Sequence, residues 1–503
     1  MDKFIEISDS LSENKSNIEE TLANCDDLLL YPWHYGPELK YRAFSVYLGT
    51  LVQDKQKNYM KQSMQDLVSH EIGQATEPTP EDVIHFFNQN GVSDQNALLI
   101  DQFDDAVAKI LSGHVVIFFD FWNKAIAFND LSINKRQVTE PATESVVKGP
   151  RESTIEQLDI NIGLLRVRLQ NPRFKIEKLK TGGETKTEIA YGYLEGKVDS
   201  ETLAEFKRRI EYAKQFEILE TAYIEELIED SKASPFPQYR YTERPDVAVA
   251  ALLQGKIVVL VQGTGSILIC PGLFTEFFQS SEDYYQRTLF SSLIRFLRVI
   301  TFFLALLLPS LYIALTTFHT ELIPTNLLMA IIDTREGLPL PAFLEAVIMV
   351  FLFEVLREAG IRLPQPIGSA ISIVGALIIG EAAISANITS PLMVIIVALT
   401  GIASFSIPQY NIAIPLRILQ IPMMIFSATL GGFGIMVFLL IVLLHLANLR
   451  SLGQPYFSPL TPLQPKQLLD VFVRRPQKWV SYSNDHTPGK PSLYKHYKRL
   501  KRR

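Results

Sequence analysis

The stretch from Phe290 to Leu449 constrains the fold of this chain more than any other feature. It opens with SSLIRFLRVITFFLALLLPSLYIAL and closes with FGIMVFLLIVLLHLANL, and the apolar runs between them are interrupted by Pro, Gly or charged residues. About 20 predominantly apolar residues are enough for a helix to cross a bilayer, so several candidate spans fit here. We therefore predict an α-helical polytopic membrane domain over 289–449.

The regions on either side of this stretch are polar and differ in charge. The chain has 503 residues and a formal net charge of −6, with the acidic surplus before the apolar stretch. The segment 450–503 instead carries twelve Lys and Arg against two Asp. A basic segment beside a span is typically cytoplasmic, so we predict a basic cytoplasmic tail over 450–503. No helix-turn-helix or aromatic-interleaved pattern accompanies it, and we predict no nucleic-acid partner.

The cysteine content and the N-terminus place the region before residue 289 in the cytoplasm. Cys25 and Cys270 lie too far apart to suggest a disulfide framework, which fits a reducing compartment. The first 20 residues have neither a basic start nor an apolar core of the kind that secretory signals carry. We therefore expect a cytoplasmic N-terminal half.

This half contains a repeat in which Asp104 matches Asp246 and Gly113 matches Gly255. Each copy has helical periodicity, then a Gly that suits a helix C-cap, then a β-branched run. A fainter match pairs the stretches that start at Tyr47 and Tyr193, each a strand followed by an amphipathic helix.

Any two α/β stretches share some likeness, but two matches in the same order at nearly the same offset favour a duplication. We predict two similar α/β subdomains, 20–135 and 155–288, joined by a linker over 136–154. The order of their elements predicts small mixed sheets with helices packed on one face.

The N-terminal half offers no catalytic constellation. It has no P-loop, nucleophile elbow or Cys/His metal spacing, and we predict no enzyme activity, no metal and no cofactor. The motif LKTGGETKT, from Leu179 to Thr187, fits a phosphate-binding nest but fits an ordinary hairpin turn better. The isolated His85 and His114 fit surface or core residues better than ligands.

Many short motifs in order along 20–460 together resemble the GerA family of spore germination proteins, specifically its A subunit. In the soluble half these are EPATESVVKGPRE from Glu140, NIGLLRVRLQNP from Asn161, IED from Ile228, SPFPQ from Ser234, TERPD from Thr242 and EDYYQR from Glu282. In the apolar half they are LPSLYIAL from Leu308, FHTELIPT from Phe318, REGLPLP from Arg335, FEVLREAGIRLPQPIG from Phe353, IVGALIIGEAA from Ile373 and ASF from Ala403.

The resemblance implies a nutrient-responsive germinant receptor in the inner membrane of a spore. In that family the A subunit is expected to be an oligomeric, pentameric cation channel. It is expected to work with a transporter-like B subunit, which holds the nutrient, and with a lipoprotein C subunit.

Buried charges in the apolar region are costly in lipid and are therefore candidate functional residues. On one helix Glu354 and Glu358 share a face with Arg357 beside them, which predicts a structural charge cluster. Glu345 points roughly the opposite way and has no local partner. In a ring of subunits it fits a cation-selecting carboxylate ring, and it fits a buried, protonated or paired glutamate equally well.

Two further charges complete the candidate set. Glu381 lies late in a span of about 366–386, as a second pore candidate or an interfacial residue. Arg417 lies in an apolar context and is expected to need a carboxylate partner. Its region, 413–449, is too long for one span, and Pro415, Pro422 and the pair Gly431-Gly432 offer breaks. With both ends cytoplasmic the span count is even, and we prefer six spans to four.

Three other functions remain open. A related spore membrane channel without its own nutrient partner fits the same motifs. A secondary transporter fits the Pro/Gly-broken spans, but its inverted repeat is not found in the apolar half. A membrane-anchored scaffold leaves Glu345, Glu381 and Arg417 without a reason to lie in lipid.

Overall fold

The computed structural model describes residues 6–35, 37–52, 85, 97–129, 131, 141, 144–363, 375 and 378–474. The chain divides into two units. Unit 1 comprises Met1–Glu229, Tyr239–Pro271 and Asn484–Arg503, and unit 2 comprises Asp230–Gln238 and Gly272–Ser483. The units are described separately.

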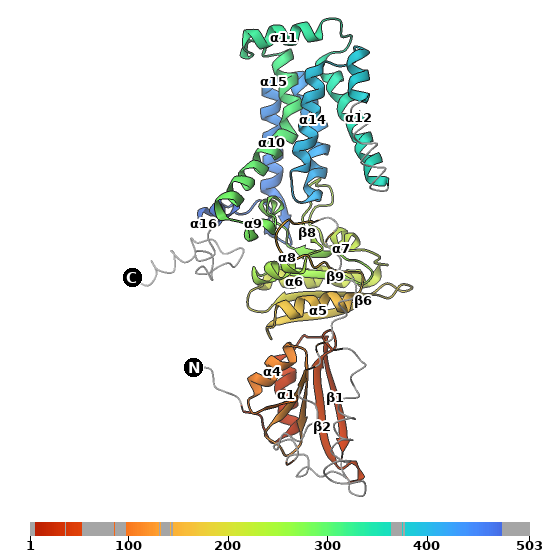
Figure 1. The fold of residues 1–503 in the computed structure, drawn as a ribbon, viewed down its shortest axis with the longest axis vertical. Coiled ribbons are helices and arrows are strands. Elements are labelled where there is room, and N and C mark those ends of the chain that lie inside the picture. The colour runs from red at the N-terminus through yellow and green to blue at the C-terminus, as the bar shows by residue number, and fades with distance from the viewer. Residues whose placement is uncertain are drawn as a thin grey trace, which may run out of the picture. The chain divides into compact units, whose positions relative to one another are not determined.

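Unit 1 contains two β-sheets (Figure 1). Each has five strands, and the two strand orders are equivalent. The first sheet has the order β1-β2-β4-β5-β3. Its elements are α1 (Leu11–Thr21), β1 (Leu28–Tyr35), β2 (Tyr41–Leu48), β3 (Ala97–Ile100), α4 (Phe103–Leu111), β4 (His114–Phe119) and β5 (Ala125–Asn129). The second sheet has the order β6-β7-β9-β10-β8. Its elements are α5 (Leu158–Arg168), β6 (Phe174–Thr181), β7 (Thr187–Leu194), α6 (Ser200–Ile210), α7 (Thr221–Ile228), β8 (Arg240–Thr242), α8 (Pro245–Leu253), β9 (Ile257–Val261) and β10 (Ile267–Cys270).

The repeated stretch falls on equivalent elements of the two sheets. It covers α4 and β4 in the first copy and α8 and β9 in the second. Gly113 and Gly255 follow the two helices with φ of 85° and 83°. A Cβ at Gly255 would lie 2.5 Å from the carbonyl oxygen of Lys197, so this position needs a glycine for space as well as conformation. The predicted pair of similar α/β subdomains is confirmed.

The prediction of mixed sheets is wrong, since all pairs among the described strands of both sheets are antiparallel. The sequence reasoning missed β3 and β8, each of which precedes a helix and takes the far edge of its sheet. Each chain segment between β2 and β4, and between β7 and β9, contains this additional strand. As a result β4 pairs antiparallel with β2, and β9 pairs antiparallel with β7. The helix expected after Tyr47 falls largely outside the described residues.

Helices cover both faces of the second sheet, whereas we predicted one covered face. Hydrophobic residues of α5 and α8 pack with Ala190, Val258 and Leu260 on one face. On the other face Phe206 of α6 contacts Tyr191, with ring centroids 5.3 Å apart. Side chains alternate between the two faces of a strand, and these strands are apolar on both.

The first subdomain begins earlier than the predicted residue 20. Ile18 and Leu22, from α1 and its end, lie in the same hydrophobic core as Phe44, Ala106 and Val116. Helix α1 has the weak amphipathic pattern LSENKSNIEET, in which Ile18 is the buried apolar residue. Leu11 and Ile18 are its two apolar residues and give little periodic signal, which is why the sequence did not place α1 in the core.

A short segment between α1 and β1 joins the two sheets. Asp26 N–H donates to Ile176 O at 2.8 Å, and Ile176 N–H donates to Asn24 O at 3.1 Å. These bonds form a parallel bridge on the edge strand β6 and so cover that edge. Beside them the fully buried Asp27 and Arg166 form a two-pronged ion pair, with N–O distances of 2.8 and 3.0 Å.

Unit 2 is built from helices, several of which run side by side (Figure 1). They are α9 (Glu282–Tyr285), α10 (Thr288–Thr317), α11 (Thr325–Arg335), α12 (Ala342–Arg362), α14 (Pro391–Phe405), α15 (Tyr410–Asn448) and α16 (Pro465–Phe472). Residues 378–385 are also helical. Among the described residues, α10 and α15 are long and apolar enough to cross a membrane by length and composition, and α14 is a shorter apolar helix.

Helix α15 reverses direction at Gly431 and forms a hairpin of two helices, 410–430 and 432–448. Gly431 has φ 61° and ψ −140°, outside the helical range. The rings of Phe426 and Phe438 lie 5.3 Å apart, whereas twelve residues of straight helix would separate them by about 18 Å. A Cβ at Gly431 would lie 2.8 Å from Cβ of Phe318 at the end of α10. The chain therefore breaks at Gly431, while Pro415 and Pro422 stay inside the first helix.

The segment after α15 folds back onto unit 2, although we predicted a tail from residue 450. Tyr456 lies in the same hydrophobic core as Phe274 and Leu446. The segment 230–238 joins this region: Phe236 packs against Phe274, and Ser234 Oγ lies 2.8 Å from His445 Nε2. Sequence polarity alone did not reveal these packed aromatic residues.

Candidate functional site in the helical unit

Glu345, for which its own helix predicted no partner, is paired with groups from other elements. Its carboxylate is fully buried at the start of α12. It lies 3.0 Å from Arg335 Nη2 and accepts a hydrogen bond from Ser390 N–H at 3.1 Å. A helical wheel considers only one helix, and these partners come from the end of α11 and the N-cap of α14. Of the two interpretations of Glu345, the structure fits a buried, paired glutamate.

Arg417 has the carboxylate partner that we expected. Its Nη1 lies 3.5 Å from Oε1 of Glu354, whose other oxygen pairs with Arg357. The Arg417 guanidinium also lies over the ring of Tyr410, 5.2 Å from its centroid. We call Glu354, Arg357, Tyr410 and Arg417 the α12–α15 cluster.

Glu358 does not belong to this cluster, although its spacing suggested it. It pairs with Arg362 at 2.6 Å, one turn further along α12. Both side chains are exposed, so this pair contributes at most about 1 kcal/mol. The predicted group of Glu354, Arg357 and Glu358 is therefore divided between two pairs.

Glu381 is exposed in the helical segment 378–385. Within the described part of the chain it has no hydrogen-bond or ion-pair partner. An unpaired carboxylate on an apolar helix is costly in lipid unless it faces water or a partner.

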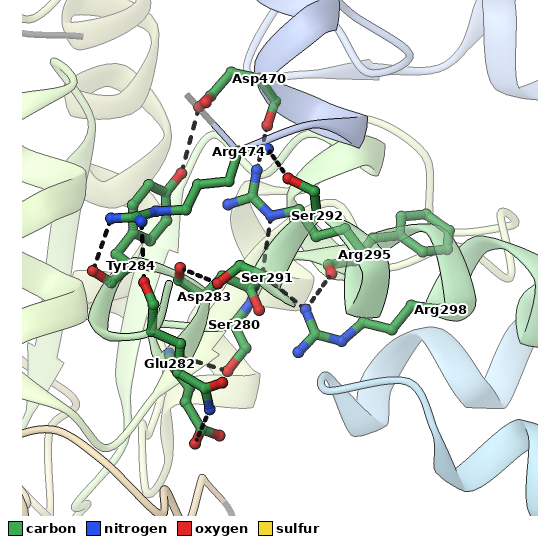
Figure 2. A network of polar contacts seen from close by, with 12 residues as sticks. Ser280, Glu282, Asp283, Tyr284, Ser291, Ser292, Arg295, Arg298, Asp470 and Arg474 are labelled. Atoms are coloured by element: carbon green, nitrogen blue, oxygen red, sulfur yellow. Dashed lines mark hydrogen bonds and ion pairs between the residues drawn. The ribbon is translucent and has the colours of Figure 1, made fainter. Parts of the chain in front are cut away.

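A second charged group lies where α10 begins, and the sequence did not reveal it. Asp283 accepts from Arg295 Nε at 3.1 Å and from Arg298 Nη1 at 2.7 Å (Figure 2). Arg474, after α16, donates to the backbone oxygens of Gln286 and Tyr284, each at 3.0 Å. We call Asp283, Tyr284, Arg295, Arg298 and Arg474 the α10 entry network.

The entry network fixes the start of α10 to segments nearly two hundred residues later in the chain. Arg295 Nη1 donates to Asp470 O, and its guanidinium lies 5.1 Å from the ring centroid of Tyr284. Burial raises the pKa of Tyr284, which therefore remains a neutral phenol. The sequence signal that could have revealed these partners is the acidic pair Glu282 and Asp283, which stands just before a helix start that carries Arg295 and Arg298.

In unit 1 the LKTGGETKT motif forms the predicted hairpin turn, and its backbone also cradles an anion. Glu217 accepts from the backbone N–H groups of Gly183, Glu184 and Thr185 at 2.8–3.1 Å and from the Thr185 hydroxyl. The hydroxyl and the three amides lower the pKa of Glu217 to about 2. The nest is therefore filled by a side chain of the same protein.

The described residues contain no group of three His, Cys, Asp or Glu that could hold a metal ion. His85 is exposed, and buried His114 lies with Nδ1 3.0 Å from Ser112 Oγ. Neither histidine is part of a ligand set among these residues.

Known proteins are similar to this chain over nearly its full length. Residues 16–485 match the family model described as Bacillus/Clostridium GerA spore germination protein. The membrane protein YfkQ of Bacillus subtilis (strain 168) is 40% identical over 93% of this chain and 90% of its own. Spore germination protein KA of the same organism is 40% identical over 93% of this chain and 85% of its own.

The crystal structure of the N-terminal domain of the A subunit of the Bacillus megaterium spore germinant receptor GerK3 is 24% identical to this chain. It matches 54% of this chain and 99% of its own length with a TM-score of 0.42. The match of the family model and the relatives at 40% identity show that the chain belongs to the GerA family of spore germination proteins.

Proposed function

We propose that this protein is the A subunit of a spore germinant receptor and takes part in the response of a spore to nutrients. The observation that carries the proposal is the family match over 16–485, together with relatives named as spore germination proteins. In this proposal the chain works with a transporter-like B subunit that holds the nutrient and with a lipoprotein C subunit. Its place is the inner membrane of the spore.

We further propose that unit 2 crosses the membrane six times. The crossings are α10, α12, the segment that includes 378–385, α14 and the two halves of α15. A helix of 20 residues is about 30 Å long, close to the thickness of the hydrocarbon core. The 21 residues of the first half of α15 and the 30 residues of α10 meet this requirement. Arg295 and Arg298 near the start of α10 favour a cytoplasmic position for that end.

The membrane part is proposed to form a cation channel from several copies of this chain, a pentamer by family resemblance. A carboxylate that selects cations must face the pore. Glu381 is exposed and free of a described partner, so it is the first pore candidate. Glu345 reaches a pore only if Arg335 and Ser390 release it, so its proposed contribution is to gating.

The receptor role is tested by deleting the gene and scoring which nutrients still trigger germination. Loss of the response to a subset of nutrients supports the proposal, and an unchanged response to every nutrient contradicts it. The channel role is tested by ion flux from liposomes that carry the protein with Glu381→Gln or Glu345→Gln. Unchanged conductance and selectivity in both variants would remove these carboxylates from the conduction path.

A related spore membrane channel without its own nutrient partner is the second candidate. The observation that favours it is that YfkQ, named only as a membrane protein, is as similar to this chain as protein KA. Deletion of the B subunit distinguishes the two functions. A receptor A subunit loses its nutrient response, whereas a channel that works alone keeps its ion flux.

A further inference from the structure

The α12–α15 cluster carries more positive than negative charge. Two guanidinium groups, of Arg357 and Arg417, share the single carboxylate of Glu354. Glu358, the residue after Arg357, is paired with the exposed Arg362, so these two side chains are neutral in sum. A net positive charge on apolar helices is costly, so an anion that completes the cluster would bind favourably.

Two buried donors at this cluster have no acceptor. Arg417 Nε and Gln420 Nε2 are buried and lack a hydrogen-bond partner in the structure as described. Gln420 is only 6% exposed and lies three residues after Arg417, so both lie on one face of the first half of α15. An unsatisfied buried donor destabilises the fold, so an acceptor from outside the chain would relieve this cost.

The cluster is also open to an approaching group. The side chains of Arg417 and Glu354 are 21% and 43% exposed, whereas Arg357 is buried. The cluster therefore combines buried donors with charged side chains that are partly exposed. Its chemistry suits an acceptor-rich anion such as a phosphate, which arginine recognises through several N–H groups.

The position of the cluster along the helices points to a lipid headgroup. Gly431, where the first half of α15 ends, lies against Phe318 at the end of α10, so the start of α15 lies toward the other end of α10. Ala342 and Ala346, at the start of α12, likewise pack with Tyr312 from the second half of α10. The end of α12 and the start of α15 therefore lie toward the starting end of α10.

The cluster lies close to the expected membrane boundary at that end. Arg417 is seven residues from the start of α15, about 10 Å along the axis, and Arg357 is five residues from the end of α12, about 8 Å. An arginine side chain reaches the interface from such a depth. The side on which Arg295 and Arg298 favour the cytoplasm is also the side on which anionic lipids are enriched.

We propose that Arg357, Arg417 and Gln420 bind the phosphate of an anionic phospholipid in the cytoplasmic leaflet. The carboxylate of Glu354 holds the two arginines in place and weakens the binding by its charge. The inference depends on the membrane crossings of the proposed function, but not on the receptor or channel role.

The test is native mass spectrometry of the full-length protein in neutral detergent, titrated with phosphatidylglycerol and, separately, with phosphatidylcholine. Phosphatidylglycerol is expected to bind more tightly. R417Q should weaken this binding about fivefold, the change that corresponds to ~1 kcal/mol for one basic residue near an anionic lipid. E354Q should strengthen it by a similar factor, because it removes the competing negative charge. Q420L should weaken it without a change of charge.

R362Q is the matched control, because it removes an exposed arginine of the same helix whose side chain is 76% exposed. It should change the affinity less than twofold. An equal loss in R362Q and R417Q would indicate diffuse surface attraction and overturn the site. A loss of affinity in E354Q would indicate a purely structural cluster and overturn it too.

A carboxylate from a second copy of the chain is the rival occupant. In that case R417Q would change the oligomeric state while leaving phosphatidylglycerol affinity unchanged, which overturns the proposal. If R417Q does not yield folded protein, E354Q and Q420L still decide, since their expected effects have opposite signs. Retention of the wild-type protein in membranes after alkaline extraction tests the membrane crossings separately.

Discussion

Each unit holds buried arginine–carboxylate contacts, and the pair of Arg166 and Asp27 in unit 1 is more complete than the α12–α15 cluster in unit 2. Arg166 gives two N–H groups to Asp27 and one to Phe174 O, and Asp27 also accepts from the Thr50 hydroxyl at 3.1 Å. In unit 2 one carboxylate, Glu354, serves two arginines, and Arg417 Nε has no partner in the described structure. A complete pair joins segments of a fold, whereas an incomplete one retains capacity for a ligand or a neighbouring chain.

The largest effect is expected from breaking the complete pair of unit 1. Arg166→Met leaves Asp27 buried and unpaired, which should lower the free energy of unfolding by ~3–5 kcal/mol. Hydrogen exchange measured by mass spectrometry on the full-length protein should show lost protection in α5 and β6. Arg208→Met is the control, since Arg208 pairs with Glu205 at the surface and its loss should leave the stability nearly unchanged. If Arg166→Met lowers the stability no more than Arg208→Met does, the distinction between the two kinds of pair is contradicted.

A smaller loss of stability is expected from changing Glu345, because its ion-pair partner Arg335 is partly exposed. Glu345→Gln keeps an acceptor for Ser390 N–H but leaves Arg335, which is partly exposed, without its countercharge. The free energy of unfolding should fall by ~1–3 kcal/mol, the range for a buried group that loses a charged partner. Unfolding of the detergent-solubilised protein measures the change. Recovery in the double variant Glu345→Gln/Arg335→Gln is expected, and a fully additive loss would show that the two residues do not interact.

Glu217 in unit 1 gives a local, pH-dependent effect. The nest lowers its pKa from 4.5 to about 2, so the contact is fully formed above pH 4.5 and is lost as the pH falls towards 2. The protection factors of the amides at 183–185, taken relative to the intrinsic exchange rate at each pH, should therefore fall as the pH falls through that window. In Glu217→Gln they should be low at every pH within the window and no longer depend on the carboxylate. Glu184→Gln is the control, because it keeps the backbone donor and removes the neighbouring charge. If Glu184→Gln has the same effect, the nest does not act through Glu217.

Much of the fold could be predicted because its signals are local. The periodic stretches before and after Gly113 and Gly255 predicted helix, turn and strand in both subdomains, and the apolar runs predicted the helical unit. The strand order could not be predicted, because strands β3 and β8 are short and their pairing joins distant segments. The break of α15 at Gly431 was one of three candidates, and tertiary contact with the end of α10 decides among them.

The candidate site residues could be identified from the sequence because a charged side chain in lipid is energetically costly. The residues that pair with them could not be identified in this way. The helical spacing on α12 predicted that Glu358 belongs with Arg357. In the structure Glu358 pairs with Arg362, and the packing of α12 against α15 brings Glu354 to Arg417. Arg335 lies on another helix than Glu345, so no helical period links them. The α10 entry network joins residues near 290 to residues near 470. A single sequence holds no signal that pairs residues so far apart in the chain.

The smallest effect on stability is expected from changing Glu381. This variant separates most clearly the charges that stabilise the helices from a charge that acts on ions. An exposed side chain without a described partner contributes little to folding, so Glu381→Gln should change the free energy of unfolding by no more than about 0.5 kcal/mol. If the proposed channel is right, the same variant should alter cation selectivity in liposomes, because a carboxylate in a pore acts on the ion. A structural residue would show the reverse, a loss of stability with unchanged selectivity. Glu345 and Glu381 therefore form a matched pair of glutamates, and measuring both properties in both variants separates the charge that holds the helices from the charge that faces the ions.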